Sequence, residues 1–212
     1  TAAVSVHMGT RVTRRSVISA RKRTALARIA LADFLEISRD REDIITAPAR
    51  MLVQNSYYCT ENLDEWTARL RVLNDELRQL AERVTPRFER PGVLVMGSPV
   101  YFPNYKIPFL MQEIGLTVLD TADAGALKVA CTDRKRVLRG GRDKIIRAIA
   151  AERYERDASS AYVQNDALFR HVRALIRRGD IEGVVYHVLK GQIEYDFELE
   201  RFEELFAGLG IP

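Results

Sequence analysis

The second half of the chain alternates short apolar runs with helical segments, and this alternation constrains the fold more than any other feature. Gly92–Met96 is an unbroken apolar run stopped by Gly97-Ser98-Pro99, which is typical of a strand buried on both faces. Asn104–Ile114 has the pattern of a helix closed by Gly115, and Leu116–Leu119 is a second short apolar run. A strand, a helix and a strand in this order predict two parallel strands joined by a crossover.

The alternation continues toward the carboxyl end. We expect helices over Asp143–Tyr154 and Asn165–Arg178, a strand over Gly183–Leu189 and a last helix over Phe197–Ala207. A short strand is also expected near Lys128–Cys131. The predicted fold class is therefore α/β, with an open, mostly parallel sheet covered by helices on both faces.

The first ninety residues have helical periodicity and no convincing strand. Arg14–Leu35 and Asp43–Tyr58 are the first two candidates, and a third helix begins at an Asn62 or Asp64 cap and ends before Pro86. In the third, apolar residues recur at helical spacing on one stripe.

We therefore expect a helical linker segment over residues 1–90 and an α/β sheet domain over residues 91–212. The chain starts at Thr1 and stops at Gly210-Ile211-Pro212, directly after a helix-stop signal. We expect it to be a piece of a longer protein in which the sheet domain is incomplete and truncated before its last strand.

Composition narrows the class of protein. Lys and Arg number 33 and Asp and Glu number 29, and this net charge of +4 is too small to predict a nucleic-acid partner. The longest apolar runs fall short of the ~20 residues that span a bilayer, so no membrane partner is expected. Two cysteines argue for a reducing, cytoplasmic location.

The loops after the predicted strands are where ligands bind in an open α/β sheet. In the first loop Ser98, Tyr101, Asn104 and Lys106 are candidate substrate-binding residues, because backbone N–H groups and a following helix N-terminus favour anions. The alternative is a connecting loop whose aromatic residues cover an edge of the core. After the second strand, Asp120, Thr121 and Asp123 are either ligands or solvated capping residues.

The third loop gathers His187, Lys190 and Glu194 at a strand end, and these are the candidate catalytic residues. His187 can donate or accept a proton near neutral pH, although a strand histidine is as often a satisfied core residue. Cys131 is the candidate metal ligand or nucleophile, and the alternative is a small buried hydrophobe.

Several stretches have a common resemblance, and they occur in this order: Asp64-Glu65-Trp66, Gly97–Pro108, Glu113–Val118, Gly183–Gln192, Tyr195–Glu198 and Gly210–Pro212. They resemble the 2-hydroxyacyl-CoA dehydratase and benzoyl-CoA reductase family, in particular the carboxyl-terminal part of a 2-hydroxyglutaryl-CoA dehydratase D-component subunit. The resemblance covers nearly the whole chain.

The resemblance implies flavodoxin-like domains and an iron–sulfur cluster, a 4Fe-4S cluster in the family. It also implies an acyl-CoA substrate, a related second subunit and an ATP-dependent activator that supplies a low-potential electron. The resulting radical loses water in the dehydratases or leads to ring reduction in the reductases. Cofactors carry such one-electron chemistry because ordinary acid–base groups do not.

The sequence departs from the family at the cluster ligands. Many members carry a ligand cysteine where this chain has Gln192, which becomes a substrate-binding candidate, and another shortly after the strand at 116–119. The cluster would then be bound mainly by residues outside this chain, with Cys131 the candidate ligand within it. Two alternatives remain open: a non-catalytic partner subunit of such a complex, and an open-sheet ligand-binding domain without redox chemistry.

Overall fold

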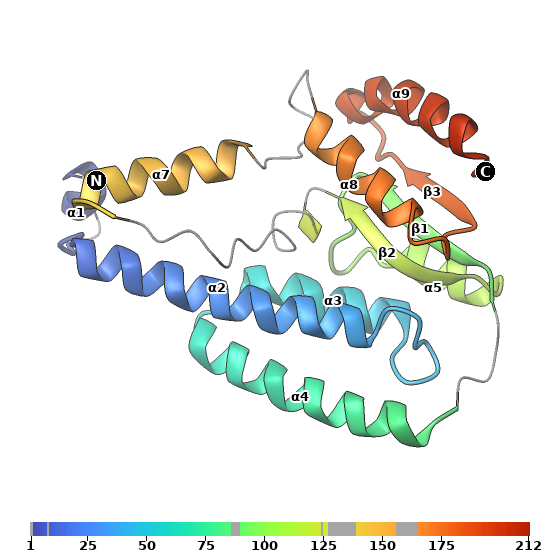
Figure 1. Ribbon diagram of the computed structural model, residues 1–212, viewed down its shortest axis with the longest axis horizontal. Helices are drawn as coiled ribbons and strands as arrows, with labels where there is room; N and C mark the ends of the chain where they lie inside the picture. Colours follow the sequence, from blue (N-terminus) through green and yellow to red (C-terminus); the bar gives the residue numbers. More distant parts are fainter. Residues whose placement is uncertain (1, 8, 86–89, 124, 127–138, 156–164) are drawn as a thin grey trace.

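The computed structural model describes residues 2–7, 9–85, 90–123, 125–126, 139–155 and 165–212 (Figure 1). Its strands form one parallel sheet of order β2-β1-β3, with these bounds: β1, Gly92–Gly97; β2, Thr117–Asp123; β3, Gly183–His187. This order matches the first three strands of a flavodoxin-like sheet. The expected α/β class, with an open parallel sheet after a helical segment, is confirmed.

The helices that precede the sheet are α1 (Ala2–His7), α2 (Arg14–Ile37), α3 (Ala47–Cys59) and α4 (Leu63–Arg83). Local sequence explains where they begin. The side chain of Asn62 accepts a hydrogen bond from the backbone of Glu65 at the start of α4, as a capping residue does. Pro48 lies in the first turn of α3, where its missing N–H costs nothing.

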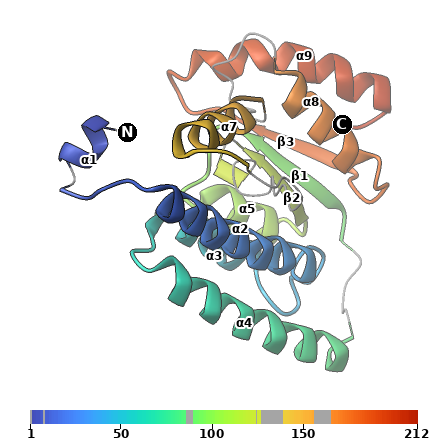
Figure 2. The same ribbon diagram turned by 60° about the vertical axis from the view of Figure 1, so that its left-hand side comes forward.

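The helices that follow β1 are α5 (Lys106–Glu113), α7 (Arg142–Glu155), α8 (Asp166–Ile176) and α9 (Ile193–Leu209). Figure 2 shows α8 and α9 over one side of the sheet, away from α3 and α4. On that side Leu94 and Met96 of β1 pack with Val172 of α8 and Phe202 of α9 in one core cluster. Phe202 is fully buried.

The other face of the sheet packs against α3 and α5. Val93, Val95 and Val118 form a core cluster there with Met51 of α3 and Met111 of α5. A third cluster joins α2, α3 and α4 without any strand. Helices therefore cover both faces of the sheet. On the α3 side, the long helices α2 and α4 extend the helical layer beyond the sheet (Figure 1).

Two buried arginines join the helical layer to the sheet. Arg50 of α3 is 3% exposed, and its guanidinium donates to the carbonyl oxygens of Ser38, Arg39 and Val118. Arg39, just after α2, pairs with Asp120 of β2 and with Asp180 in the turn before β3. The end of α2 is thus tied to two separate parts of the sheet domain.

The structure differs from the sequence expectations in the bounds of several elements: α3 begins four residues after the expected Asp43, and β3 ends at His187 and not at Leu189. β2 continues to Asp123, so Asp120 and Thr121 lie within a strand and not in a loop. α9 begins at Ile193, one turn before the expected Phe197. The strand expected near Lys128–Cys131 lies outside the described residues. Among the helices that the structure describes, none is long and apolar enough to cross a membrane.

Candidate functional site

The loops after β1 and β3 are joined through Ser98, which is 1% exposed. Its backbone N–H donates to the carbonyl oxygen of His187 at 2.7 Å. Its hydroxyl accepts from the backbone N–H of Leu189 at 2.9 Å and donates to Oε1 of Gln192. Two residues predicted as substrate-binding, Ser98 and Gln192, therefore meet at the carboxyl ends of adjacent strands.

His187 lies at the same edge and is partly buried. Its Nδ1 is 3.3 Å from the carbonyl oxygen of Ser98. A carbonyl can only accept, so this contact favours the tautomer that carries the proton on Nδ1 and leaves Nε2 as an acceptor. Gly97 makes the approach possible: it has φ +100°, and a Cβ there would collide with the His187 carbonyl.

Asp123 ends β2 at this edge, and its side chain organises the neighbouring loops. It accepts from the backbone N–H of Ala126 at 2.7 Å and of Val100 at 3.4 Å. Burial raises the pKa of Asp123 above its ordinary value, and these backbone hydrogen bonds oppose the shift. The Tyr58 hydroxyl donates to the carbonyl oxygen of Gly125 at 2.6 Å, which ties α3 to the same loop.

The remaining predicted residues lie nearer to solvent. Tyr101 is 44% exposed, and burial of its hydroxyl region raises its pKa. The candidates Lys190, Glu194, Asn104 and Lys106 are exposed. Their catalytic or binding roles stay predictions.

The candidate metal ligand, Cys131, lies outside the described residues. Cys59, at the end of α3, is exposed. In the part of the chain that the structure describes, no group of three or more His, Cys, Asp or Glu side chains is placed to hold a metal ion. An iron–sulfur cluster requires thiolate ligands, so the described residues do not fit such a cluster by themselves.

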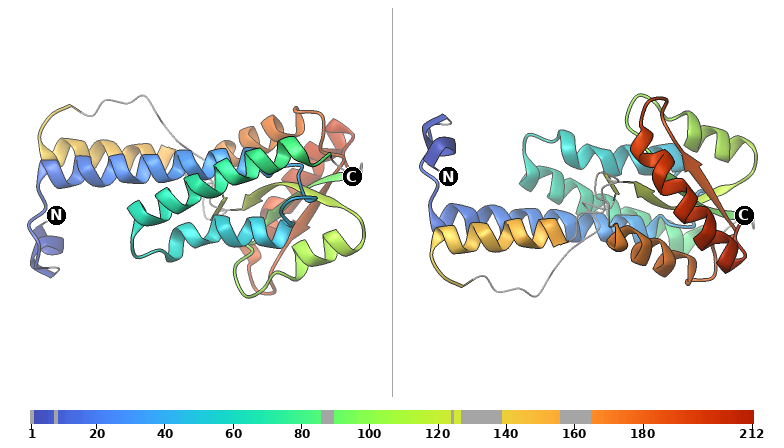
Figure 3. Two further views of the ribbon diagram at one scale, coloured as in Figure 1. Left: turned by 90° about the horizontal axis from the view of Figure 1, so that it is seen from below. Right: turned by 90° about the horizontal axis from the view of Figure 1, so that it is seen from above.

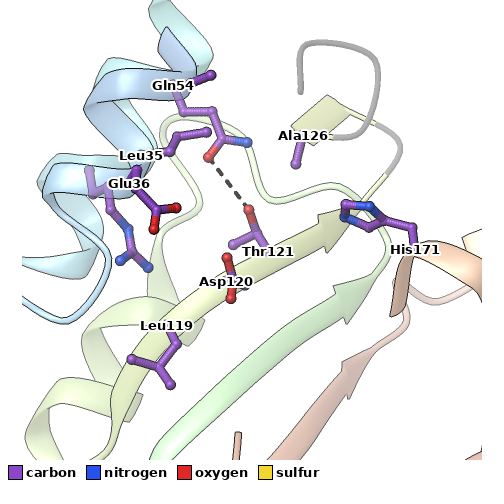
Figure 4. Close-up of a pocket in the computed structure, with 10 residues that line it drawn as sticks. Leu35, Glu36, Gln54, Leu119, Asp120, Thr121, Ala126 and His171 are labelled. Atoms are coloured by element: carbon purple, nitrogen blue, oxygen red, sulfur yellow. Dashed lines mark hydrogen bonds between the residues drawn. The ribbon is translucent and has the colours of Figure 1, made fainter. Parts of the chain in front are cut away.

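A second polar site lies beside β2 (Figure 4). It is a cavity of about 150 Å³ between α2, α3, β2 and α8, and its polar lining residues are Glu36, Arg50, Gln54, Asp120, Thr121 and His171. The Thr121 hydroxyl is 3.4 Å from Oε1 of Gln54, so the strand and α3 are linked across the cavity. Burial lowers the pKa of His171, and the charge of Asp120 opposes that shift.

Sequence reasoning missed the four polar residues that helices contribute to this cavity, which are Glu36 of α2, Arg50 and Gln54 of α3, and His171 of α8. Arg50 and Gln54 are buried polar residues on α3, and their spacing of four positions places them on one helical face. Burial lowers the pKa of Arg50 to about 10, and nearby Asp120 and Glu42 oppose the shift. The signal in the sequence that could have found this site is the polar pair Arg50 and Gln54, which lie four positions apart on the buried face of α3.

Comparison with known proteins adds one family. The family model described as 2-hydroxyglutaryl-CoA dehydratase, D-component, matches residues 1–212. None of the curated proteins matches the chain.

Proposed function

Because this chain belongs to the 2-hydroxyglutaryl-CoA dehydratase D-component family, we propose that it works as a subunit of a 2-hydroxyacyl-CoA dehydratase-type complex. In this proposal the complex acts on an acyl-CoA thioester in the cytoplasm, together with a related second subunit and an ATP-dependent activator. The chemistry proposed for the complex is low-potential one-electron dehydration or reduction. The observation that carries the proposal is a family match over every residue of the chain.

The edge formed by Ser98, His187 and Gln192 is the part of this chain that we assign to the substrate. It lies at the carboxyl ends of β1 and β3, where open α/β sheets bind ligands. Ser98 uses its hydroxyl to hold Gln192 and the backbone of Leu189. The Gln192 carboxamide, oriented through its oxygen, then has N–H groups with which to donate to a thioester carbonyl.

The iron–sulfur cluster of the proposed complex finds no thiolate set among the described residues of this chain. Gln192 stands where many family members carry a ligand cysteine, and its oxygen is engaged by Ser98. We therefore assign the cluster ligands to the second subunit or to parts of the protein outside the described residues. Only the cluster ligands are assigned elsewhere. The proposed contact with the acyl-CoA remains with the Ser98–Gln192 edge of this chain.

A second candidate function is a non-catalytic partner subunit, and the same Ser98–Gln192 contact favours it. A hydrogen-bonded amide in place of a thiolate gives a stable polar contact with no redox role. The two candidates differ in one measurable property, which is whether this chain contacts the acyl-CoA.

The test is acyl-CoA binding by the complete complex, prepared anaerobically with its second subunit. We expect Gln192→Ala to weaken binding about tenfold, because one hydrogen bond to a polar ligand is lost. Glu113→Gln, an exposed change on α5, is the matched control and should leave binding unchanged. Equal affinity of the Gln192→Ala and control complexes would favour the non-catalytic subunit.

The iron content of the same complexes tests the ligand assignment. Gln192→Ala should leave the iron content at its wild-type value, since the assigned ligands lie elsewhere. Loss of iron in that variant would place this edge at the cluster and overturn the assignment.

A further inference from the structure

One end of the molecule carries a strongly basic surface that the proposed site does not use. Residues 11–28 contain seven Arg or Lys and no Asp or Glu. Residues 139–147 contain four Arg or Lys and one Asp. We call these two segments the basic arm. Its formal charge is +10, whereas the whole chain carries +4, so the remainder carries −6. The small net charge of the chain hides a large separation of charge.

The two segments of the basic arm lie side by side. The Arg14 Nε–H donates to the carbonyl oxygen of Gly140 at 2.9 Å, and Arg142 donates to that of Val12 at 3.3 Å. Figure 3 shows α2 and α7 together at one end of the molecule, extending beyond the sheet. Arg15, Lys22 and Lys144 are exposed on this arm.

The arrangement of charge in α2 is unfavourable for the isolated helix. Its first turn contains Arg14 and Arg15 and no acidic residue. The positive end of the helix dipole lies there, and it favours acidic side chains. Two arginines at the positive end of a helix dipole are locally destabilising, and such residues are typical of sites retained for an interaction. An anionic partner would offset this destabilisation.

The opposite end of the molecule carries the complementary surface. α9 contains six acidic residues and one arginine. Four exposed acidic residues follow each other at spacings of four, three and one on its outer side, and we call them the acidic face: Asp196, Glu200, Glu203 and Glu204. The buried Phe202 and Phe206 occupy the inner side of the same helix.

The dimensions of the two surfaces also match. At 1.5 Å per residue, Asp196 to Glu204 spans about 12 Å along α9, and Arg15 to Lys22 spans about 10 Å along α2. Figures 1 and 3 place α9 and the free end of α2 at opposite ends of the long axis, so one copy does not join its own two surfaces. An antiparallel two-fold pair brings each basic arm to the acidic face of the other copy and closes the assembly.

We infer that the basic arm docks on the acidic face of α9 in a second copy of this chain, forming an antiparallel two-fold pair. Single-stranded nucleic acid is the weaker alternative, because residues 11–28 and 139–147 contain no aromatic side chain on which a base could stack. Duplex DNA needs only phosphate contacts, and the test below distinguishes it. The acidic partner surface, by contrast, is present on the chain itself. The inference does not depend on the acyl-CoA site.

The test is a charge swap, with the dimer dissociation constant of the complete protein measured by sedimentation velocity. The arm variant carries Arg15→Glu and Lys22→Glu, and the helix variant carries Glu200→Lys and Glu204→Lys. Arg15→Glu places an acid in the first turn of α2, so the helix itself should not weaken. The control, Arg71→Glu with Arg83→Glu on α4, makes the same change in net charge as the arm variant.

We expect the wild-type dissociation constant to rise about tenfold or more between about 50 mM and about 500 mM salt. Each swap variant alone should bind itself at least about tenfold more weakly than the wild type, because the swap lowers the formal charge of the basic arm from +10 to +6, or that of the acidic face from −4 to zero. An equimolar mixture of the two variants should pair more tightly than either variant alone. The mixed pair restores one wild-type contact, and in the other contact the substituted positions of the two copies carry opposite charges. The α4 control should pair as the wild type does.

Three results would overturn the inference: a wild type that is monomeric at low salt, a swap variant that pairs like the wild type, or a mixture that does not pair. Binding of duplex DNA by a monomeric wild type, lost in the arm variant, would overturn it and identify the arm as a nucleic-acid surface.

Discussion

Replacing Arg39 with methionine should test how the helical layer is held to the sheet. The Arg39 side chain is 7% exposed and forms a two-bond contact with Asp180 and a further ion pair with Asp120 at 2.6 Å. The positions are far apart in sequence, separated by 81 residues to Asp120 and by 141 to Asp180. One guanidinium therefore joins the end of α2, β2 and the turn before β3.

The expected loss follows from the burial of each partner. Hydrogen bonds to charged groups contribute about 1.5–3 kcal/mol each. The Asp180 side chain is 44% exposed, so its pair belongs at the low end, whereas that of Asp120 is 20% exposed. Together they give a loss of about 3–4 kcal/mol in the free energy of unfolding for Arg39→Met, which falls within the range measured for breaking buried pairs.

Urea denaturation followed by circular dichroism measures this loss. With a slope of about 2 kcal/mol per molar urea, the midpoint should fall by about 1.5–2 M. Arg78→Met is the matched control, because the Arg78–Asp75 pair of 2.9 Å is exposed on both sides. That pair should contribute less than about 0.5 kcal/mol.

A double-mutant cycle with Asp180→Asn isolates the pair itself. We expect a coupling free energy of about 1–2 kcal/mol between Arg39 and Asp180. A loss for Arg39→Met no larger than that for the Arg78→Met control, or a coupling energy near zero, would refute the conclusion that Arg39 holds the helical layer to the sheet.

Three further changes have defined outcomes. Gly97→Ala should lower the free energy of unfolding by about 3 kcal/mol or more in urea, because it combines a positive φ with a collision at the His187 carbonyl. Phe202→Ala should cost about 3–5 kcal/mol by the same measurement, since Phe202 is fully buried and stacks on Phe169 at 4.1 Å. The pKa of His171 is lowered in the folded protein, so the unfolded chain takes up the proton first and stability should fall as pH drops from about 7 to 5. A pH profile of His171→Asn that is as steep as the wild type would contradict this.

Much of the secondary structure followed from local signals. A cap at Asn62 or Asp64 and the apolar stripe after it predicted α4, and the hydrogen bond from the backbone of Glu65 identifies Asn62 as the cap. The run Gly92–Met96 predicted β1, whose six residues are all buried. Such signals are readable because caps and periodic burial depend on neighbours within a few residues.

The errors occur where distant contacts outweigh local preference. Asp120 and Thr121 have the composition of a loop, yet both lie in β2. Arg39 neutralises Asp120, and Gln54 is within hydrogen-bond distance of Thr121, so the polar residues are accommodated in the strand. Neither partner is near in sequence.

The sequence by itself determined that this chain is α/β, where most of its helices begin and which loops follow the strands. Only the tertiary structure decided that Ser98 meets Gln192 across 94 residues and that Arg39 meets Asp180 across 141. It also decided that the basic and acidic surfaces lie at opposite ends of the molecule. The physical reason is that helices and buried strands are specified by local periodicity, whereas a site depends on how packed layers bring distant side chains together.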